Sequence, residues 1–386
     1  MNSSATTNIA ICGAGPVGLA LAAMLVARGV SPAGITLIDA KALGQAGADP
    51  RSLALSYGSG ELLQAIGAWP LPATPIHDIH VSRRGQFGRT LIDRQDHGVP
   101  ALGYVTRYGE LVQALAGVCE RAGVRSLRPV RVSEAHEHAD GVTLAMADGA
   151  SLEAALVVWA EGGVFGEQEN RAHGAGHRTR DYQQSAVIAR VSTSAPLAHR
   201  AFERFTDEGP LALLPQDGSD GHRYALVWCV RPASAARLLA LDEREFLVQL
   251  GRAFGSRLGE FTAASARAAY ALGLNAEPRA TARTVAIGNA AQTLHPVAGQ
   301  GLNLGLRDAA VLARLLAQEH PSAAIGEFIV QRSADRGAIV GLTDLMARAF
   351  AVPGPQQALL GLSLGAIDAV KPARALLAEL MMFGRR

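Results

Sequence analysis

The sequence has few cysteines, and they lie far apart. Cys12, Cys119 and Cys229 are odd in number and share no Cys-x-x-Cys spacing. Neither a disulfide framework nor a cysteine-based metal site is therefore available, and no bound metal is expected. The low cysteine content predicts a reducing environment and a cytoplasmic protein.

An excess of charge of one sign is also missing. The 36 lysines and arginines nearly balance the 34 aspartates and glutamates, which argues against nucleic acid as a partner. Charged residues make up only 18% of the chain and hydrophobic residues 49%, a composition that excludes a disordered chain. With 386 residues, the chain has room for two or three domains of about 150 residues each.

Long uninterrupted hydrophobic runs are absent as well. The run from Ile9 to Val26 is broken by three glycines and a proline, and no basic leader precedes it, so it predicts neither a spanning helix nor a signal peptide. The tail from Gln356 to Arg386 alternates leucines with basic residues and predicts one or two amphipathic helices. Such helices could pack on their own domain or a partner subunit, or could make a peripheral contact with the inner face of the membrane.

Glycine, in contrast, is abundant and clustered. A β-type run ends at Cys12, and the turn Gly13-Ala14-Gly15-Pro16-Val17-Gly18 opens an Ala/Leu-rich helix. In this context the first glycine allows a sharp turn, the second lets a pyrophosphate approach the backbone, and the third brings helix and strand together. Asp39 follows Gly18 by 21 residues, where a carboxylate would accept a hydrogen bond from a ribose hydroxyl. These features predict a dinucleotide site but do not separate NAD from FAD.

Two β-rich stretches interrupt this α/β pattern. Periodicity predicts helices at 57–67, 107–122 and 242–254, a hairpin at 76–93, and strands at 124–127, 130–135, 142–146, 156–159, 186–191, 211–214, 224–230 and 283–287. We therefore predict an α/β fold with a discontinuous Rossmann-like domain formed by residues 1–75, 101–180 and 271–345. Residues 76–100 and 181–270 would form an inserted β-sheet substrate domain, and residues 346–386 a C-terminal helical segment.

A second glycine-rich stretch, residues 288–308, favours FAD. A strand ends at Gly288, a loop carries His295 and Pro296, and a helix is predicted to begin near Gly299. The free N–H groups at such a helix start stabilise negative charge. A reduced flavin carries negative charge at N1 and the neighbouring carbonyl, so it would be stabilised there.

These residues also resemble a known family, the class A flavin monooxygenases, and within it the ubiquinone-biosynthesis hydroxylases. The resemblance is carried by the glycine turn, Asp39, the run Asp49–Ser56 and the stretch Gly288–Asp308. Asn289 and Gln292, with the runs Phe202–Thr206, Gly209–Ala212 and Met381–Arg385, resemble the branch of 2-polyprenyl-6-methoxyphenol hydroxylases. The resemblance implies a fold like that of para-hydroxybenzoate hydroxylase. One departure is Glu161, which stands where relatives carry aspartate.

The resemblance implies roles for particular residues. Arg51 would contact FAD, Arg107 its ribityl or phosphate region, and Asn289 a ribityl hydroxyl. The isoalloxazine ring would face the helix start formed by Gly299, Gln300, Gly301, Leu302 and Asn303. His295, with Pro296 beside it, is the candidate catalytic base, although a histidine next to a proline is also common as an ordinary loop residue.

The implied activity is an FAD-dependent NAD(P)H aromatic monooxygenase. It would hydroxylate a polyprenylated methoxyphenol in ubiquinone biosynthesis with O₂, through a flavin C4a-hydroperoxide, and NAD(P)H would bind transiently between the domains. An assembly with other enzymes of the pathway is a further implied partnership. The alternatives are hydroxylation of another ring position, a flavin reductase or oxidase acting on an apolar substrate, and a non-catalytic partner-binding protein.

Overall fold

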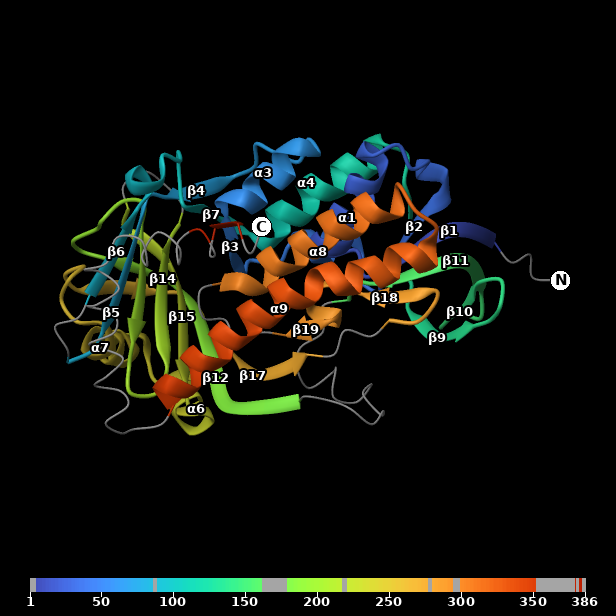
Figure 1. The fold of residues 1–386 in the computed structure, drawn as a ribbon. Helices are drawn as coiled ribbons and strands as arrows, with labels where there is room; N and C mark the ends of the chain where they lie inside the picture. The colour runs from blue at the N-terminus through green and yellow to red at the C-terminus, as the bar shows by residue number, and fades with distance from the viewer. Residues whose placement is uncertain are drawn as a thin grey trace.

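The computed structural model describes residues 5–85, 89–161, 179–216, 221–276, 280–293 and 299–351, together with residues 379, 382 and 383. Two β-sheet regions lie at opposite ends of the molecule, and helices α8 and α9 run between them (Figure 1). The chain passes from one region to the other and back, so segments distant in sequence meet in each.

The first sheet has seven strands and is mostly parallel. Its strands are β1 (Ala5–Cys12), β2 (Ile35–Ile38), β8 (Arg125–Leu127), β9 (Val132–Glu137), β10 (Val142–Met146), β11 (Ser151–Trp159) and β18 (Thr284–Ala286). They follow the order β8-β2-β1-β11-β10-β9, and β18 pairs with β11. All four residues of β2 are buried, as expected for a parallel strand covered on both faces.

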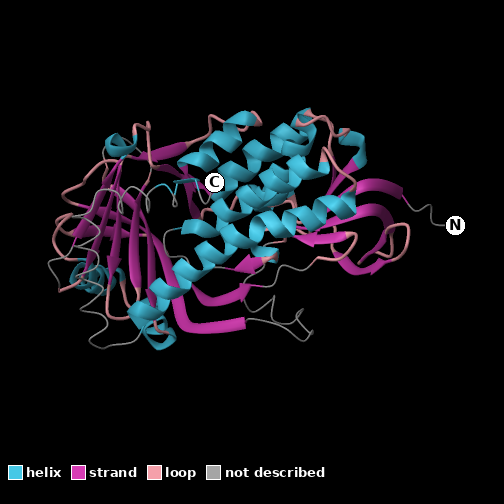
Figure 2. Ribbon diagram, in the orientation of Figure 1, coloured by secondary structure: helices cyan, strands magenta, loops and turns pink. Residues whose placement is uncertain are grey.

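Helices form a layer beside this sheet (Figure 2). They are α1 (Pro16–Ala27), α2 (Leu43–Gly47), α3 (Tyr57–Ala65), α4 (Tyr108–Arg121), α8 (Gln300–Leu316) and α9 (Pro321–Ala351). Helix α1 is apolar on nearly every side, and every residue from Leu19 to Leu25 is buried in one core with side chains of α4 and α8. The core therefore holds the start of α1, where the glycine turn lies.

A small antiparallel sheet lies between the two large ones. It consists of β3 (Ser52–Ser56), β7 (Gly103–Arg107) and β4 (Ala73–Ile76), in that order. Short 3₁₀ turns occur at η1 (Pro32–Gly34), η2 (Arg94–His97) and η3 (Gly288–Ala290).

The third sheet has nine strands. They are β5 (Asp78–Arg83), β6 (Arg89–Asp93), β12 (Thr179–Thr193), β13 (Arg200–Phe205), β14 (Pro210–Pro215), β15 (Arg223–Val230), β16 (Phe261–Ala264), β17 (Ala268–Ala276) and β19 (Gln292–Thr293). Helices α6 (Pro232–Ala240) and α7 (Glu243–Phe254) pack on one face, where Phe202, Leu213 and Leu226 meet Phe246 and Leu250. The opposite face is left for contacts with the rest of the molecule.

Most predicted elements are present, with bounds that differ by a few residues. The helices predicted at 57–67, 107–122 and 242–254 are α3, α4 and α7, and the predicted hairpin is β5–β6. Helix α6 was not predicted, and β19 forms at the start of the predicted loop after Gly288. Strands β12, β17 and β19 carry the nine-stranded sheet beyond residues 181–270, and we keep the predicted domain division as a proposal.

The structure also bears on the membrane question. Within the described ranges, no helix is long and apolar enough to cross a membrane. The predicted amphipathic tail lies almost entirely outside those ranges.

Candidate functional site

The glycine turn joins β1 to α1, and two of its glycines are needed for packing. Gly13 has a φ of 103°, and a Cβ atom there would lie 2.6 Å from the backbone of Ala160 and Glu161. A Cβ on Gly18 would lie 1.9 Å from the carbonyl oxygen of Gly13. Both positions therefore exclude any side chain, because the helix, the turn and the end of β11 meet there.

Gly15 has a different environment. A Cβ there would meet only the hydroxyl of Tyr108, at 3.0 Å. Gly15 is the N-cap of α1, no side chain caps the helix, Pro16 lacks an N–H, and the first turn has no acidic residue. The positive end of α1 is thus approached over bare backbone, which fits the pyrophosphate of a dinucleotide.

Asp39 lies at the end of β2 and holds the turn in place. Its Oδ2 accepts a hydrogen bond of 2.7 Å from the N–H of Ala14, and its Oδ1 accepts one of 2.8 Å from the N–H of Lys41. Arg128, just beyond β8, donates to the carbonyl of Ala14 and, at 3.4 Å, to that of Lys41. The sequence held no signal for Arg128, because only the pairing of β8 with β2 brings it to the turn. A carboxylate has further lone pairs, so these bonds leave Asp39 able to accept from a ribose hydroxyl.

Arg51 forms a compact cluster with Asp49 and Tyr108. Its Nη2 lies 2.7 Å from Oδ2 of Asp49, and its guanidinium carbon lies 4.9 Å from the centre of the Tyr108 ring. The hydrogen bond to Asp49 raises the pKa of Arg51 against the opposing effect of burial, and Tyr270 of β17 adds to the rise. Arg51 therefore remains charged, and the interaction with Tyr270 places it near β17.

Arg107 is brought close to Arg51 by strand pairing. It ends β7, caps α4 and is registered opposite Ser52, the residue after Arg51. Both predicted flavin-contacting arginines thus lie at one end of the three-stranded sheet, and their contacts with FAD stay predictions.

Asn303, in the first turn of α8, ties that helix to β3. Its Oδ1 accepts 2.8 Å hydrogen bonds from the N–H of Ser56 and the hydroxyl of Ser59. Its Nδ2 donates to the carbonyls of Ala54 and Gly299 at 3.1 and 2.9 Å. This amide is saturated within the protein, so Asn303 positions the helix start, and only its backbone is left for the predicted contact with a ring.

The loop before α8 is held by a buried ion cluster. Asp308, 0% exposed, accepts from Arg332 at 2.7 Å and from Arg336 and Gln292 at 3.0 Å. It also accepts from the N–H of Gly288 at 3.3 Å. Gln292, predicted only as a family feature, therefore links β19 to α8, and Asp308 joins both to α9.

The remaining predicted residues are placed as follows. Gly299 has a φ of 60° and caps α8, with Gln300, Gly301 and Leu302 in the first turn. Asn289 is exposed in η3, and its Oδ1 lies 3.9 Å from the Cβ position of Gly301. Glu161 follows β11. Burial is the main cause of the raised pKa of the Cys12 thiol, and Glu161 adds to the rise, which places the Glu161 carboxylate near the glycine turn. His295 and Pro296 lie outside the described residues.

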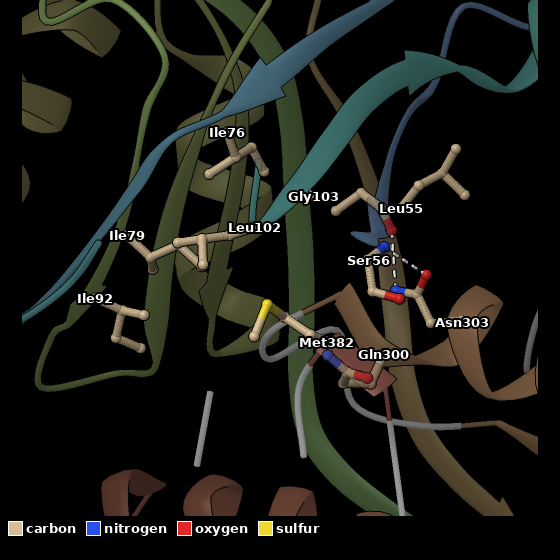
Figure 3. A pocket seen from close by; sticks show the side chains of 11 residues that line it. Leu55, Ser56, Ile76, Ile79, Ile92, Leu102, Gly103, Gln300, Asn303 and Met382 are labelled. Carbon is tan, nitrogen blue, oxygen red and sulfur yellow. Dashed lines mark hydrogen bonds between the residues drawn. The ribbon is translucent and has the colours of Figure 1, made fainter. Parts of the chain in front are cut away.

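An apolar cavity lies beside the start of α8 (Figure 3). Ala54, Ser56, Gln300 and Asn303 line one side. Isoleucines and a leucine from β4, β5, β6 and the segment before β7 line the other, together with Met382 from the C-terminal tail. The lining is Ala54, Leu55, Ser56, Ile76, Ile79, Ile92, Leu102, Gly103, Gln300, Asn303 and Met382. The cavity can therefore hold an apolar group next to the helix start. Among the described residues, no group of three or more His, Cys, Asp or Glu side chains could hold a metal ion.

Comparison with known proteins identifies the family. Residues 6–340 match the family model of the FAD binding domain. The chain is 34% identical to ubiquinone hydroxylase UbiL of Rhodospirillum rubrum over 382 residues, covering 96% of this chain and 88% of that protein. It is 31% identical to the 3-demethoxyubiquinol 3-hydroxylase of Escherichia coli, covering 80% of this chain and 79% of the relative. This chain belongs to the ubiquinone hydroxylase family of FAD-dependent monooxygenases.

Solved structures confirm the fold of this ubiquinone hydroxylase family member. The p-nitrophenol 4-monooxygenase PnpA from Pseudomonas putida superposes with a TM-score of 0.77 at 19% identity, covering 99% of this chain and 100% of that one. HpxO of Klebsiella pneumoniae, solved with FAD and uric acid, gives a TM-score of 0.74 at 17% identity, with coverages of 98% and 97%. The predicted α/β flavin monooxygenase fold, the FAD cofactor and the class of aromatic hydroxylase are confirmed. Membership of the 2-polyprenyl-6-methoxyphenol branch stays a prediction.

Sequence reasoning assigned no role to one further residue of this hydroxylase, Glu203 of β13. Its Oε1 is buried without a hydrogen-bond partner, and burial raises the pKa of its carboxyl from 4.5 to about 8. The run Phe202–Thr206 marked it only as a family resemblance. Glu203 is paired with Val81 of β5, which is distant in the sequence, so no local pattern could have signalled the burial of its Oε1.

This raised pKa predicts a pH-dependent stability. Between about pH 4.5 and pH 8 the unfolded chain loses the Glu203 proton while the folded protein keeps it, so stability falls as the pH rises. The slope is at most about 1.4 kcal/mol per pH unit. Glu203→Gln cannot titrate and should become increasingly more stable than the wild type from pH 5 to pH 8. Denaturant unfolding of both proteins, each saturated with FAD, measures the difference, and two curves that stay parallel across this range would contradict the assignment.

Proposed function

We propose that this protein hydroxylates the ring of a polyprenylated methoxyphenol in ubiquinone biosynthesis, using NAD(P)H and O₂. The observation that carries this proposal is the apolar cavity beside the start of α8. It places an apolar binding space next to the helix end predicted to face the flavin. The relatives named for ubiquinone hydroxylation support the pathway.

The residues of the chain divide the work between binding, positioning and exclusion of water. When bound, FAD supplies the activation of O₂ and the transfer of one oxygen atom. The bare turn at Gly15, with Asp39 and Arg51, would hold its dinucleotide part. Asn303 fixes the start of α8 against β3, so the backbone N–H groups at the helix start keep a fixed orientation toward the predicted position of the flavin ring.

The cavity wall would exclude water from the reacting ring. Ile76, Ile79 and Ile92 present only hydrocarbon to this space, and Met382 closes it on the side of the C-terminal tail. A long apolar substituent would be stabilised along this wall by burial of its surface. A methoxyphenol with a polyprenyl tail combines such a substituent with a ring for hydroxylation.

Turnover with isotopically labelled oxygen tests the proposal. The FAD-loaded enzyme is mixed with NADPH or NADH, ¹⁸O₂ and a farnesylated 2-methoxyphenol, and the product is analysed by mass spectrometry and NMR. We expect one labelled oxygen in the product and oxidation of the nicotinamide that depends on the phenol. Nicotinamide oxidation without label in the product would indicate a reductase or oxidase, and a label at another carbon would indicate a different ring position. Failure to bind FAD in a fluorescence titration would favour a non-catalytic partner-binding protein.

We also keep two predictions about partners. A peripheral membrane contact through residues 356–386 fits the amphipathic pattern of that segment, and an assembly with other enzymes of the pathway fits the apolar substrate. Flotation with anionic vesicles, with and without residues after Val370, would test the first.

A further inference from the structure

Helices α6 and α7 cover one face of the nine-stranded sheet. The opposite face is called the second face. Glu203 lies on the second face, because its neighbour Phe202 packs in the core beneath the helices. Strand pairing aligns Glu203 with Val81 on one side and with Ala212, Val227 and Ile188 on the other. All four neighbours are apolar and only half-buried. The carboxyl therefore stands alone in an apolar row that retains accessible surface.

This row adjoins the apolar cavity beside α8. Ala201, two residues before Glu203 on the same face, is paired with Ile79 of the cavity wall. Ala201 also packs with Ile76 and Val105 of the three-stranded sheet. Residues two apart on a strand are separated by about 7 Å, so Glu203 is one such step from the wall.

The same face also looks toward the predicted flavin contacts. Tyr270 of β17 lies on this face, since it is paired through Ala186 with Cys229. The pKa of Arg51 is affected most by Asp49 and by burial, and to a smaller extent by Tyr270. This effect places β17 near Arg51. Glu203 thus lies on the sheet face that meets the three-stranded sheet at Ala201 and Arg51 at Tyr270.

Neighbouring charges do not account for the raised pKa of the Glu203 carboxyl. Within the described residues, the other titratable side chains on this face are Arg83, Arg190, Arg223, Cys229 and Tyr270, of which Arg190 and Arg223 are exposed near strand ends. Burial is the sole cause of the raised pKa of Glu203, and the carboxyl in turn helps to raise that of Cys229. A buried acceptor without a partner is destabilising, so its presence calls for a ligand that donates a hydrogen bond to it.

We propose that Glu203 is the residue that binds the phenolic hydroxyl of the substrate and accepts its proton. The inference rests on the proposed function, because it needs a phenol in the space beside the cavity. In this step the O–H bond of the phenol breaks, the proton moves to a carboxylate oxygen of Glu203, and the electron pair stays on the phenolate oxygen. No oxidant is consumed, and the electron-rich ring is then ready for oxygen transfer.

The chemistry of the row favours a phenol over other ligands. The side chains of Val81, Ala212, Val227 and Ile188 offer no hydrogen bonds, so a ligand with a single hydroxyl and an otherwise apolar outline matches Glu203 and these four neighbours. With a pKa of about 8, the fraction of Glu203 that is ionised and able to accept the proton rises as the pH approaches 8, and a base whose pKa lies near the working pH is well matched to general base catalysis. A substrate whose hydroxyl is methylated would leave Oε1 without a donor and should bind less well.

The first test measures binding and does not require turnover. The FAD-loaded wild type and Glu203→Gln are titrated with the farnesylated 2-methoxyphenol and with its O-methyl ether, following changes in the flavin absorption spectrum from pH 6 to pH 9. At pH 9, where Glu203 is ionised, we expect the wild type to prefer the phenol by about tenfold or more, the worth of one hydrogen bond to a charged group, and we expect this preference to weaken towards pH 6 as the carboxyl becomes protonated. In Glu203→Gln we expect a smaller preference that does not change with pH, because the amide oxygen still accepts a hydrogen bond but carries no charge and does not titrate. An unchanged preference in the variant would overturn the proposal.

The second test measures turnover. Removal of a general base should lower kcat/KM by about 100-fold or more, with most of the loss in kcat and with nicotinamide oxidation no longer matched by product. Glu203→Asp should recover part of the rate and the pH dependence. Asp207→Asn, an exposed carboxylate four residues away, is the matched control and should behave as the wild type. A Glu203→Gln enzyme with wild-type kcat and pH profile would contradict the proposal.

The two tests separate this inference from the proposed function. If the wild type forms no hydroxylated product from any phenol, the proposed function fails, and the binding preference still decides the role of Glu203. If the wild type turns over normally and Glu203→Gln does the same, only the role of Glu203 fails.

Discussion

Replacing Asp308 with asparagine is expected to lower the free energy of unfolding by about 3–5 kcal/mol. Asp308 is fully buried and accepts hydrogen bonds from Arg332 and Arg336, whose side chains are 5% and 8% exposed. The asparagine side chain would carry no charge, so the cluster of Arg307, Arg332 and Arg336 would face Asp335 alone. A buried guanidinium without a counter-charge is among the most costly defects that a single substitution can create.

Denaturant unfolding of the FAD-saturated proteins measures this loss. Asp207→Asn is the control, because its carboxylate is 74% exposed and meets Arg84 only at 3.7 Å, and it should change stability very little. The double variant Asp308→Asn/Arg336→Met removes one of the orphaned charges and should recover part of the loss. An Asp308→Asn variant as stable as the wild type would show that the charge of Asp308 is not needed to balance the buried arginines.

Asp308→Asn should also weaken the binding of FAD. Asp308 binds the N–H of Gly288 and the side chain of Gln292, so its loss frees the segment between β18 and α8. We expect weaker FAD binding as well as lower stability. Retention of FAD affinity at a protein concentration and temperature where the variant is fully folded would limit the role of Asp308 to folding.

Replacing Gly18 with alanine is the second substitution with a large expected effect. The added methyl group would lie 1.9 Å from the carbonyl oxygen of Gly13, which is backbone and cannot rotate away. Overpacking of this kind costs about 3 kcal/mol or more, and the variant should unfold at a much lower temperature. FAD affinity would fall with it, because the turn and helix α1 separate.

Gly15→Ala separates packing from cofactor binding. Its methyl group would meet only the Tyr108 hydroxyl at 3.0 Å, so we expect stability within about 1 kcal/mol of the wild type. FAD affinity should nevertheless fall by about tenfold or more, because a methyl group would keep the pyrophosphate from the backbone. Gly44→Ala, where nothing lies within 4 Å, is the control for both measurements. A folded Gly15→Ala protein with unchanged FAD affinity would contradict the predicted position of the pyrophosphate.

The parts of the site that depend on neighbouring residues could be predicted from the sequence. The strand, the glycine turn and helix α1 follow each other directly, and Asp39 lies at the end of the next strand, so spacing alone indicated their arrangement. The start of α8 at Gly299 and Gln300 was predicted for the same reason. Helix α6, from Pro232 to Ala240, was missed because it is short and lies directly before α7.

The parts that depend on distant residues could not be predicted. Asp308 meets Arg332 and Arg336 only because α9 packs along α8, and Arg128 reaches Ala14 only because β8 pairs with β2. Glu203 looks like an ordinary alternating strand residue until β5, β14 and β15 surround it. Charges brought together by tertiary structure leave no periodic signal in the chain.

The pairing of the first sheet also sets an order of events during synthesis. Strand β1 pairs with β11, and β11 with β18, which ends at Ala286. Synthesis must therefore continue from β1 to the end of β18 before this sheet is complete, and the strands from β12 to β17 emerge in the meantime. Parallel pairing between such distant segments is slow to form. The glycine turn after β1 therefore lacks the neighbouring strands β11 and β18 until they have been synthesised. The sheet that carries the glycine turn therefore stays incomplete until long after the turn itself has been synthesised.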